Sequence, residues 1–109
     1  MRTGKLLIAG SSNTDLVIRS SQLPEPGETV TGGEFFQALG GKGANQAVAA
    51  TRAGADVTFL SCVGDDDYGK AALDAFTREG INTDFIRIDE EAASGIALIM
   101  VDGKGENII

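Results

Sequence analysis

The segment Leu39–Ala50, LGGKGANQAVAA, places three glycines and a lysine directly before an alanine-rich run. Alanine has the highest helix propensity, and Gly54 stands where a helix commonly ends in a left-handed residue. We therefore predict a helix over Ala44–Ala53. Because backbone N–H groups are exposed at a helix N-terminus, the glycine-rich junction before this helix is suited to hold a small ligand.

Known phosphate-binding loops do not match this junction. A P-loop ending at Gly41-Lys42 needs a glycine at Phe36 and a hydroxyl side chain at Gly43. The dinucleotide-binding pattern of three glycines fits Gly41 and Gly43 but meets Gln46 at its third position. The spacing therefore argues against a phosphate cradle.

Other kinds of site are also disfavoured. The chain has no histidine, which removes most catalytic triads and zinc sites. Asp65, Asp66 and Asp67 are consecutive, whereas a calcium loop alternates its ligands. The net charge is −7 and the basic residues are scattered, so no basic stripe for nucleic acid exists.

Apolar runs on both sides of the junction predict an α/β fold. Lys5–Ala9 and Val57–Val63 read as buried strands, and with the intervening glycine-rich turn and helix they indicate a βαβ unit. An acidic turn, Asp65–Gly69, precedes an amphipathic helix over Gly69–Glu79, which stops at Gly80. A short strand follows within the segment INTDFIRI.

The remaining segments read as strands and turns. We expect a strand over Leu16–Arg19, a loop around Pro24 and Pro26, and a strand–turn–strand over Thr29–Leu39. The Asp-Gly pair in Asp102–Gly105 predicts a hairpin between two apolar runs, Ile96–Val101 and Glu106–Ile109. The second arm stops after four residues, so we expect the chain to continue beyond Ile109; a complete small domain is the alternative.

The composition suits one small domain of 109 residues. The single cysteine, Cys62, lies in an apolar run, and we expect it to be a buried core residue in a reducing compartment. The apolar run near the N-terminus is too short for a signal peptide, and no segment approaches the ~18 apolar residues of a membrane span. We therefore expect a cytoplasmic protein with no membrane or nucleic-acid partner.

A second polar cluster, GSSNTD over Gly10–Asp15, follows the first strand. Ligands of α/β sheets bind beyond the carboxyl ends of strands, where this cluster lies. Asn13 and Asp15 are two residues apart, so in an extended chain their side chains face the same way. With Lys42 and Asn45 they form a mixed set of donors and acceptors that suits sugar hydroxyls. Each cluster alone also fits turn or capping chemistry, and that reading stays open.

The motifs together resemble the ribokinase-like (PfkB) carbohydrate kinases. The residues that carry the likeness cover essentially the whole chain in the family's order: GSSNTDLV, LPEPGETV, GGKGANQAVAATRAGADVTFLSCVG, VGDDDYG, REGIN and SGIALIMVDGKGENII. The resemblance implies an α/β sandwich with a small β-sheet lid, its strands drawn from residues 29–39 and 94–109. It also implies a homodimer formed through that lid.

The resemblance assigns sugar-binding roles residue by residue. Asn13 and Asp15 match the pair that binds ribose hydroxyls, and Ala97 and Ile99 match apolar lid residues over the sugar. The other residues that it places in the two binding segments are Thr14, Gly41, Lys42, Gly43, Ala44 and Asn45.

The resemblance implies a kinase that transfers the γ-phosphoryl group of ATP to the 5-hydroxyl of D-ribose, with Mg²⁺ and a monovalent cation such as K⁺. The family's catalytic aspartate belongs to a Gly-Ala-Gly-Asp motif that this sequence lacks, so we expect the 109 residues to have no catalytic residue, metal site or kinase activity of their own. Two alternatives remain. One is a kinase for another acceptor, such as deoxyribose, another pentose or fructose; a nucleoside is disfavoured, because the expected lid offers no obvious pocket for a base. The other is a non-catalytic sugar-binding module.

Overall fold

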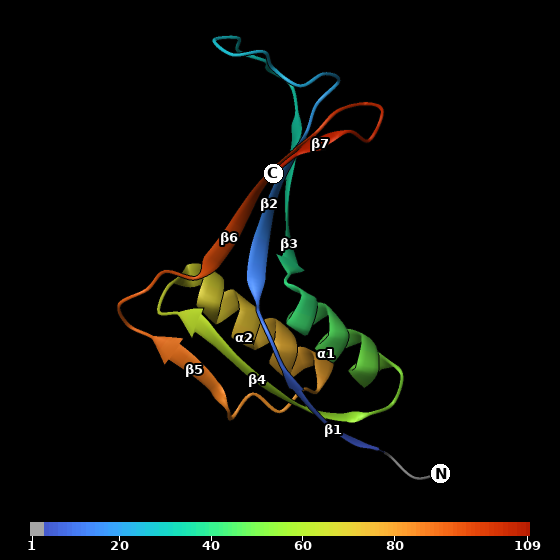
Figure 1. Ribbon diagram of the computed structural model, residues 1–109, viewed down its shortest axis with the longest axis vertical. Coiled ribbons are helices and arrows are strands. Elements are labelled where there is room, and N and C mark those ends of the chain that lie inside the picture. The colour runs from blue at the N-terminus through green and yellow to red at the C-terminus, as the bar shows by residue number, and fades with distance from the viewer. Residues whose placement is uncertain (1–3) are drawn as a thin grey trace. The chain divides into compact units, whose positions relative to one another are not determined.

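The computed structural model describes residues 4–109, which form two compact units (Figure 1). The first unit holds the chain up to Thr14 and Leu39–Gly95, and the second holds Asp15–Ala38 and Ile96–Ile109. The α/β fold class predicted from the sequence is confirmed.

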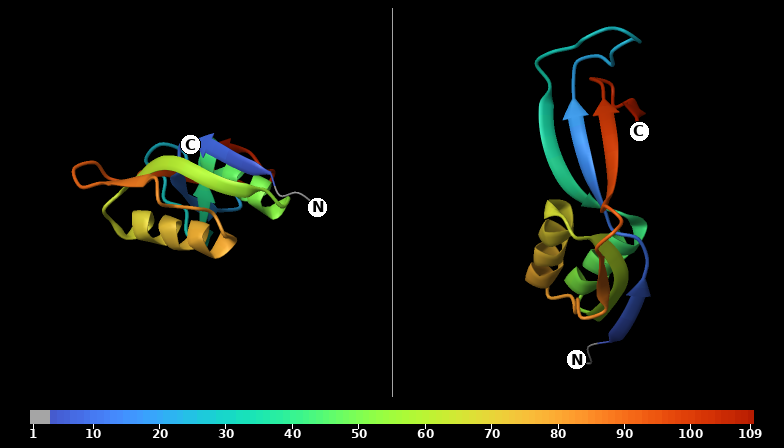
Figure 2. Two further views of the ribbon diagram at one scale, coloured as in Figure 1. Left: turned by 90° about the horizontal axis from the view of Figure 1, so that it is seen from below. Right: turned by 90° about the vertical axis from the view of Figure 1, so that its left-hand side faces the viewer.

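The first unit is a parallel sheet with two helices on one face. Its strands are β1 (Lys5–Ala9), β4 (Asp56–Gly64) and β5 (Ile86–Asp89), in the order β1-β4-β5. The helices α1 (Lys42–Arg52) and α2 (Asp67–Glu79) lie beside each other against this sheet, as the left view of Figure 2 shows. Both helices end before a left-handed glycine, at Gly54 and Gly80, as the sequence predicts.

Large apolar side chains from β4 and α2 form the centre of the first unit's core. Val57, Phe59 and Phe76 are fully buried. The rings of Phe59 and Phe76 meet edge to face, with centroids 5.4 Å apart. The small residues Ala44 and Ala47 form the buried side of α1, so this helix packs close to the sheet.

The face of the sheet away from the helices is open among the described residues. Alternate residues of β4 point to opposite sides, so Phe59 and Val63 face the helices while Leu60 and Cys62 face outward. The prediction that Cys62 is buried is therefore wrong, because the strand is covered on one face only.

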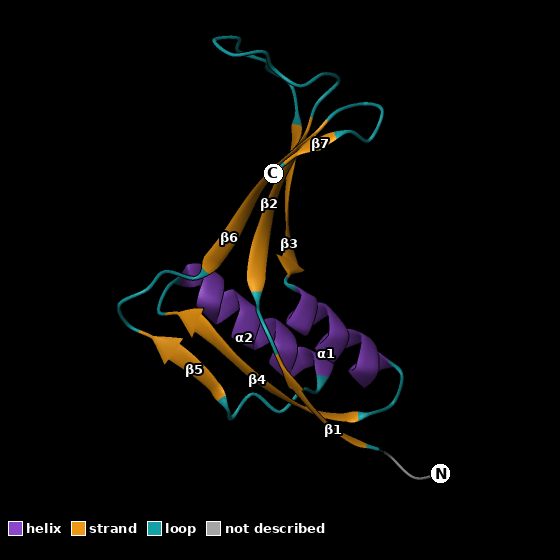
Figure 3. Cartoon of the chain, viewed as in Figure 1, coloured by secondary structure: helices purple, strands orange, loops and turns teal. Residues whose placement is uncertain are grey.

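The second unit contains the sheet of β2 (Asn13–Arg19), β3 (Glu34–Gly40), β6 (Gly95–Val101) and β7 (Asn107–Ile108), in the order β3-β2-β6-β7 (Figure 3). The predicted hairpin is confirmed, because β6 and β7 pair antiparallel around the turn over Asp102–Gly105. The expected strand at the start of Thr29–Leu39 is absent, and β3 begins only after the left-handed Gly32.

The predicted βαβ unit of Lys5–Ala9, the first helix and Val57–Val63 is present in outline: β1 and β4 pair in parallel, and β2 and β3 of the four-stranded sheet come between β1 and α1 in the chain. The strand that runs into α1 is β3, which pairs in the four-stranded sheet, so α1 does not join β3 to β4 within one sheet. A second βαβ unit is formed by β4, α2 and β5. Neither helix in residues 4–109 is long and apolar enough to cross a membrane.

Candidate functional site

The two polar clusters singled out in the sequence meet in the first unit. The backbone N–H of Ala44, in the first turn of α1, donates to the carbonyl of Ser11, just after β1, at 3.0 Å. Gly43 and Gly10 touch through their main chains, and a Cβ on Gly43 would lie 2.7 Å from the carbonyl carbon of Gly10. We call this contact between Gly10–Ser12 and Gly41–Gly43 the glycine junction.

Gly41 is required at the junction for two separate reasons. Its φ of 96° lies in a region that residues with a side chain rarely adopt. A Cβ at this position would also lie 2.6 Å from the carbonyl oxygen of Ser11, well inside van der Waals contact. The glycines therefore allow the N-terminus of α1 to rest directly on the end of β1.

The start of α1 is open to a ligand. No side chain caps the helix and no acidic residue stands in its first turn. The first N–H with an acceptor inside the helix is that of Asn45, which donates to the carbonyl of Gly41. The N–H groups of Lys42 and Gly43 come before it and can donate to a bound oxygen. The side chains of Lys42 and Asn45 are exposed, whereas Gly43 and Ala44 are buried and contribute through the main chain.

Asn13 and Asp15 both lie in β2, with their side chains half-buried. Because they are two residues apart in a strand, their side chains project from the same face, as the sequence predicts. Thr14 lies between them, points the other way and is buried. Asp15 opens the second unit, which also contains Ala97 and Ile99 on β6.

Asn13 has a contact with Gly95 that the sequence pattern does not predict. The side chain of Asn13 packs on Gly95, where a Cβ would lie 2.4 Å from the Oδ1 atom of Asn13. Gly95 is preceded by Ser94, whose main-chain N–H and hydroxyl both donate to the carboxylate of Asp66. Neither Gly95 nor Ser94 carries a motif that spacing alone could have identified.

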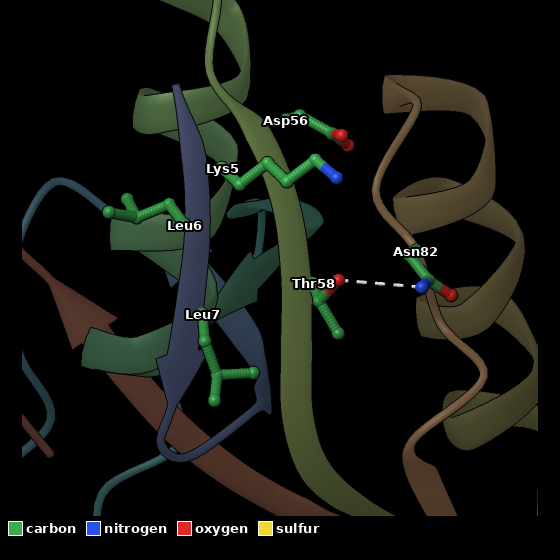
Figure 4. Close-up of a pocket in the computed structure, with 6 residues that line it drawn as sticks. All are labelled: Lys5, Leu6, Leu7, Asp56, Thr58 and Asn82. Carbon is green, nitrogen blue, oxygen red and sulfur yellow. Dashed lines mark hydrogen bonds between the residues drawn. The ribbon is translucent and has the colours of Figure 1, made fainter. Parts of the chain in front are cut away.

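A hollow on the outer face of the parallel sheet lies at the opposite end of the strands from the glycine junction. Its volume is about 440 Å³, and Figure 4 shows Lys5 and Asp56 projecting at one end and a hydrogen bond of 3.4 Å from Asn82 to Thr58. Ligands of parallel sheets bind at the carboxyl ends of the strands, whereas Lys5 and Asp56 stand at the starts of β1 and β4. The hollow is therefore not the candidate site.

Two acidic side chains in the first unit, Asp66 and Asp89, serve structural contacts. The carboxylate of Asp66 caps α2, and the backbone N–H of Ser94, the hydroxyl of Ser94 and the N–H of Gly69 hold its pKa below the usual range. The pKa of Asp89 is lowered in the same way by the N–H groups of Ala92 and Glu91. Within residues 4–109 no three acidic or cysteine side chains gather closely enough to hold a metal ion.

Comparison with known proteins places this site in context. The family model described as pfkB family carbohydrate kinase matches residues 3–109. The ribokinase of Haemophilus influenzae is 48% identical over 104 residues, which cover 95% of this chain and 34% of that protein. The chain thus spans about a third of the length of the curated relatives it matches.

Solved structures show the same fold. A ribokinase from Giardia lamblia superimposes with a TM-score of 0.85 at 34% identity and covers 98% of this chain and 32% of its own. The Arabidopsis thaliana ribokinase, solved with ribose and ATP, gives a TM-score of 0.85 at 29% identity over 99% of this chain and 35% of its own. The resemblance noted in the sequence is confirmed.

Proposed function

Because the chain belongs to the pfkB family of carbohydrate kinases, we propose that it forms the sugar-binding part of a ribokinase. The whole enzyme would transfer the γ-phosphoryl group of ATP to the 5-hydroxyl of D-ribose. The observation that carries the proposal is the glycine junction, which brings the open N-terminus of α1 to the end of β1, next to Asn13.

The polar groups that the resemblance assigns to the sugar have the chemistry that a ribose ring requires. The carboxylate of Asp15 accepts hydrogen bonds from two hydroxyls, and Lys42 donates to hydroxyl oxygens. The amides of Asn13 and Asn45 do both, so one hydroxyl can be donor to one residue and acceptor from another. Ala97 and Ile99 stay predictions, as apolar contacts to the sugar.

The reaction itself needs groups that we do not assign to this chain. Phosphoryl transfer requires a metal ion on the phosphates and a group that orients the attacking hydroxyl. The sequence has no Gly-Ala-Gly-Asp motif, and the described residues contain no cluster of three acidic or cysteine side chains that could hold Mg²⁺. This chain's part in catalysis is therefore to bind ribose and orient its 5-hydroxyl.

We also propose that the enzyme is a homodimer joined through the four-stranded sheet. One face of this sheet carries exposed apolar side chains, among them Phe35 at 60% and Leu98 at 66% exposure. Together with Leu16, Ile18 and Ile108 they line a shallow apolar hollow of about 430 Å³. A cytoplasmic location is likewise a proposal, and fractionation of cells that express the gene tests it.

The kinase proposal is tested in a chimera that carries this chain in place of the segment to which it aligns in the Haemophilus influenzae ribokinase. We expect ribose-dependent formation of ADP. Asp15→Asn should raise the KM for ribose by about tenfold or more, because a site built for hydroxyls loses a charged acceptor. Asp74→Asn, an equal change of charge on the exposed surface of α2, should leave this KM unchanged.

Each alternative predicts a different result. A kinase for another sugar would prefer 2-deoxyribose or fructose over ribose in competition assays. A sugar-binding module would bind ribose in calorimetry yet support no turnover in the chimera, and the gene read past Ile109 would lack a Gly-Ala-Gly-Asp motif. The isolated 109-residue chain should form no ADP with ribose, and ribose-dependent turnover by the pure chain would contradict this assignment of roles.

A further inference from the structure

The cap of α2 reaches far beyond its own helix. One carboxylate oxygen of Asp66, Oδ1, accepts from the N–H of Gly69 at 2.8 Å and from the hydroxyl of Ser94 at 2.7 Å. The other oxygen, Oδ2, accepts from the N–H of Ser94 at 2.9 Å. The N–H of Gly64, at the end of β4, donates to the Ser94 hydroxyl oxygen at 2.9 Å. An ordinary cap needs only the first of these bonds.

Close main-chain packing fixes the same segment. A Cβ on Gly64 would lie 2.3 Å from the nitrogen of Ser94, and a Cβ on Gly69 would lie 2.0 Å from the carbonyl oxygen of Gly64. Backbone atoms cannot rotate away as a side chain does, so this packing restricts the position of Ser94 against the start of α2. We call Gly64, Asp66, Gly69 and Ser94 the serine clasp.

The serine clasp ends beside a proposed sugar-binding group. The residue after Ser94 is Gly95, and a Cβ there would lie 2.4 Å from Oδ1 and 3.3 Å from Cγ of Asn13. The amide of Asn13 lies directly against the main chain of Gly95, so this contact restricts how the amide can turn. The position of Gly95 in turn follows from the clasp.

We infer that Asp66 and Ser94 are positioning residues that hold Gly95 against Asn13 and so set the direction in which the Asn13 amide meets the sugar. The inference rests on the proposed function, and it adds two residues that touch no substrate. A displaced Gly95 would leave the Asn13 side chain free to rotate, and the sugar would then have to order it on binding.

The test uses the chimera with the substitution Asp66→Asn. The amide keeps an acceptor for Gly69 but turns an NH₂ group toward one of the two donors of Ser94, which breaks one side of the clasp. We expect the KM for ribose to rise about tenfold, equivalent to about 1.4 kcal/mol. The KM for ATP should stay unchanged and kcat should change less than the KM for ribose. Asp65→Asn removes the same charge from the exposed neighbouring residue and should change none of the three.

Comparing the change in the KM for ribose with the change in kcat distinguishes a positioning role from a general loss of folded protein. A variant that merely folds less well has fewer active molecules, which lowers the apparent kcat and leaves the KM for ribose as it was. Ser94→Ala, a milder change that keeps the main-chain N–H bond, should also raise the KM for ribose. The double variant should be no worse than Asp66→Asn alone, because both changes break one clasp.

The outcomes distinguish a failure of the proposed kinase function from a failure of the positioning role. A chimera that phosphorylates no sugar overturns the proposed function. If the chimera is active but Asp66→Asn and Ser94→Ala both have the same KM for ribose as Asp65→Asn, the positioning role is overturned. The kinase proposal then still stands. If Asp66→Asn does not fold, the KM for ribose and the kcat of Ser94→Ala decide the question.

Discussion

Replacing Gly41 by alanine should lower kcat/KM for ribose by more than a loss of chain stability explains. The new methyl group would stand 2.6 Å from the carbonyl oxygen of Ser11, and the backbone would remain at a φ of 96°. The same carbonyl accepts the hydrogen bond from Ala44 that seats α1 on the end of β1. The substitution therefore acts on the glycine junction and nowhere else.

The size of the effect follows from these two contacts. Backbone strain at a glycine-only conformation costs about 1–3 kcal/mol. Ordinary contact with the methyl group begins near 3.4 Å, so the Ser11 carbonyl and the helix must separate by about 0.8 Å. Misplacing binding groups by about 1 Å can cost about 100-fold in rate. We expect kcat/KM for ribose to fall about 100-fold in the chimera.

Gly54→Ala is the matched control. Gly54 has a φ of 102°, but a Cβ there meets no atom within 4 Å. This variant carries the strain without the collision, at the other end of the same helix. It should lower the urea midpoint of unfolding, as Gly41→Ala does, and leave kcat/KM for ribose unchanged.

The assay measures both quantities on both variants, namely kcat/KM for ribose and the urea midpoint. If Gly41→Ala loses no more kcat/KM than Gly54→Ala, the contact with Ser11 does not shape the sugar site. The placement of that site at the glycine junction would then be refuted.

Three further predictions concern the core, the dimer and pH. Phe76→Ala should lower the free energy of unfolding by about 3–5 kcal/mol, because it opens a cavity beside Phe59, whereas Phe85→Ala, at an exposed position, should change it by about 0.5 kcal/mol or less; urea unfolding checks both. Leu98→Asp should convert a dimer to a monomer in light scattering, and a variant that stays dimeric would contradict the proposed interface. Because folding lowers the pKa of Asp66, its contribution to stability is present above about pH 4 and is lost as the pH falls through the lowered pKa. The difference in urea midpoint between the wild type and Asp66→Asn should therefore be full at pH 6 and shrink toward pH 3; a constant difference would count against this.

Local signals in the sequence predict most of the elements correctly. The alanine run gives α1, the Asp-Gly pair gives the β6–β7 hairpin, and Gly54 and Gly80 end the helices as expected. The errors concern partners that lie far away in the chain. Whether a second layer covers the outer face of the parallel sheet, and so buries Cys62, depends on packing that no short window of sequence encodes.

For the candidate site as well, the sequence predicts some features and misses those that depend on distant parts of the chain. That Gly41 and Gly43 meet the segment after β1 follows from the rule that ligand-binding loops gather at strand ends, and the structure brings these segments together. The contact of Gly95 with Asn13 could not be predicted, because the two residues lie 82 positions apart in the chain (95 − 13) and no local pattern links them. The roles of the individual residues in binding sugar stay predictions that the variants above address.

The glycine contacts also determine where this protein can be redesigned. Gly10, Gly41 and Gly43 are fixed by the distance between two main chains, so they must persist whatever molecule the site holds. Lys42 and Asn45 lie in the same turn, and their side chains are exposed and are not part of the core. A library that varies these two side chains and keeps the three glycines should therefore yield folded proteins with altered sugar preference, whereas randomising the whole turn should yield mostly unfolded ones.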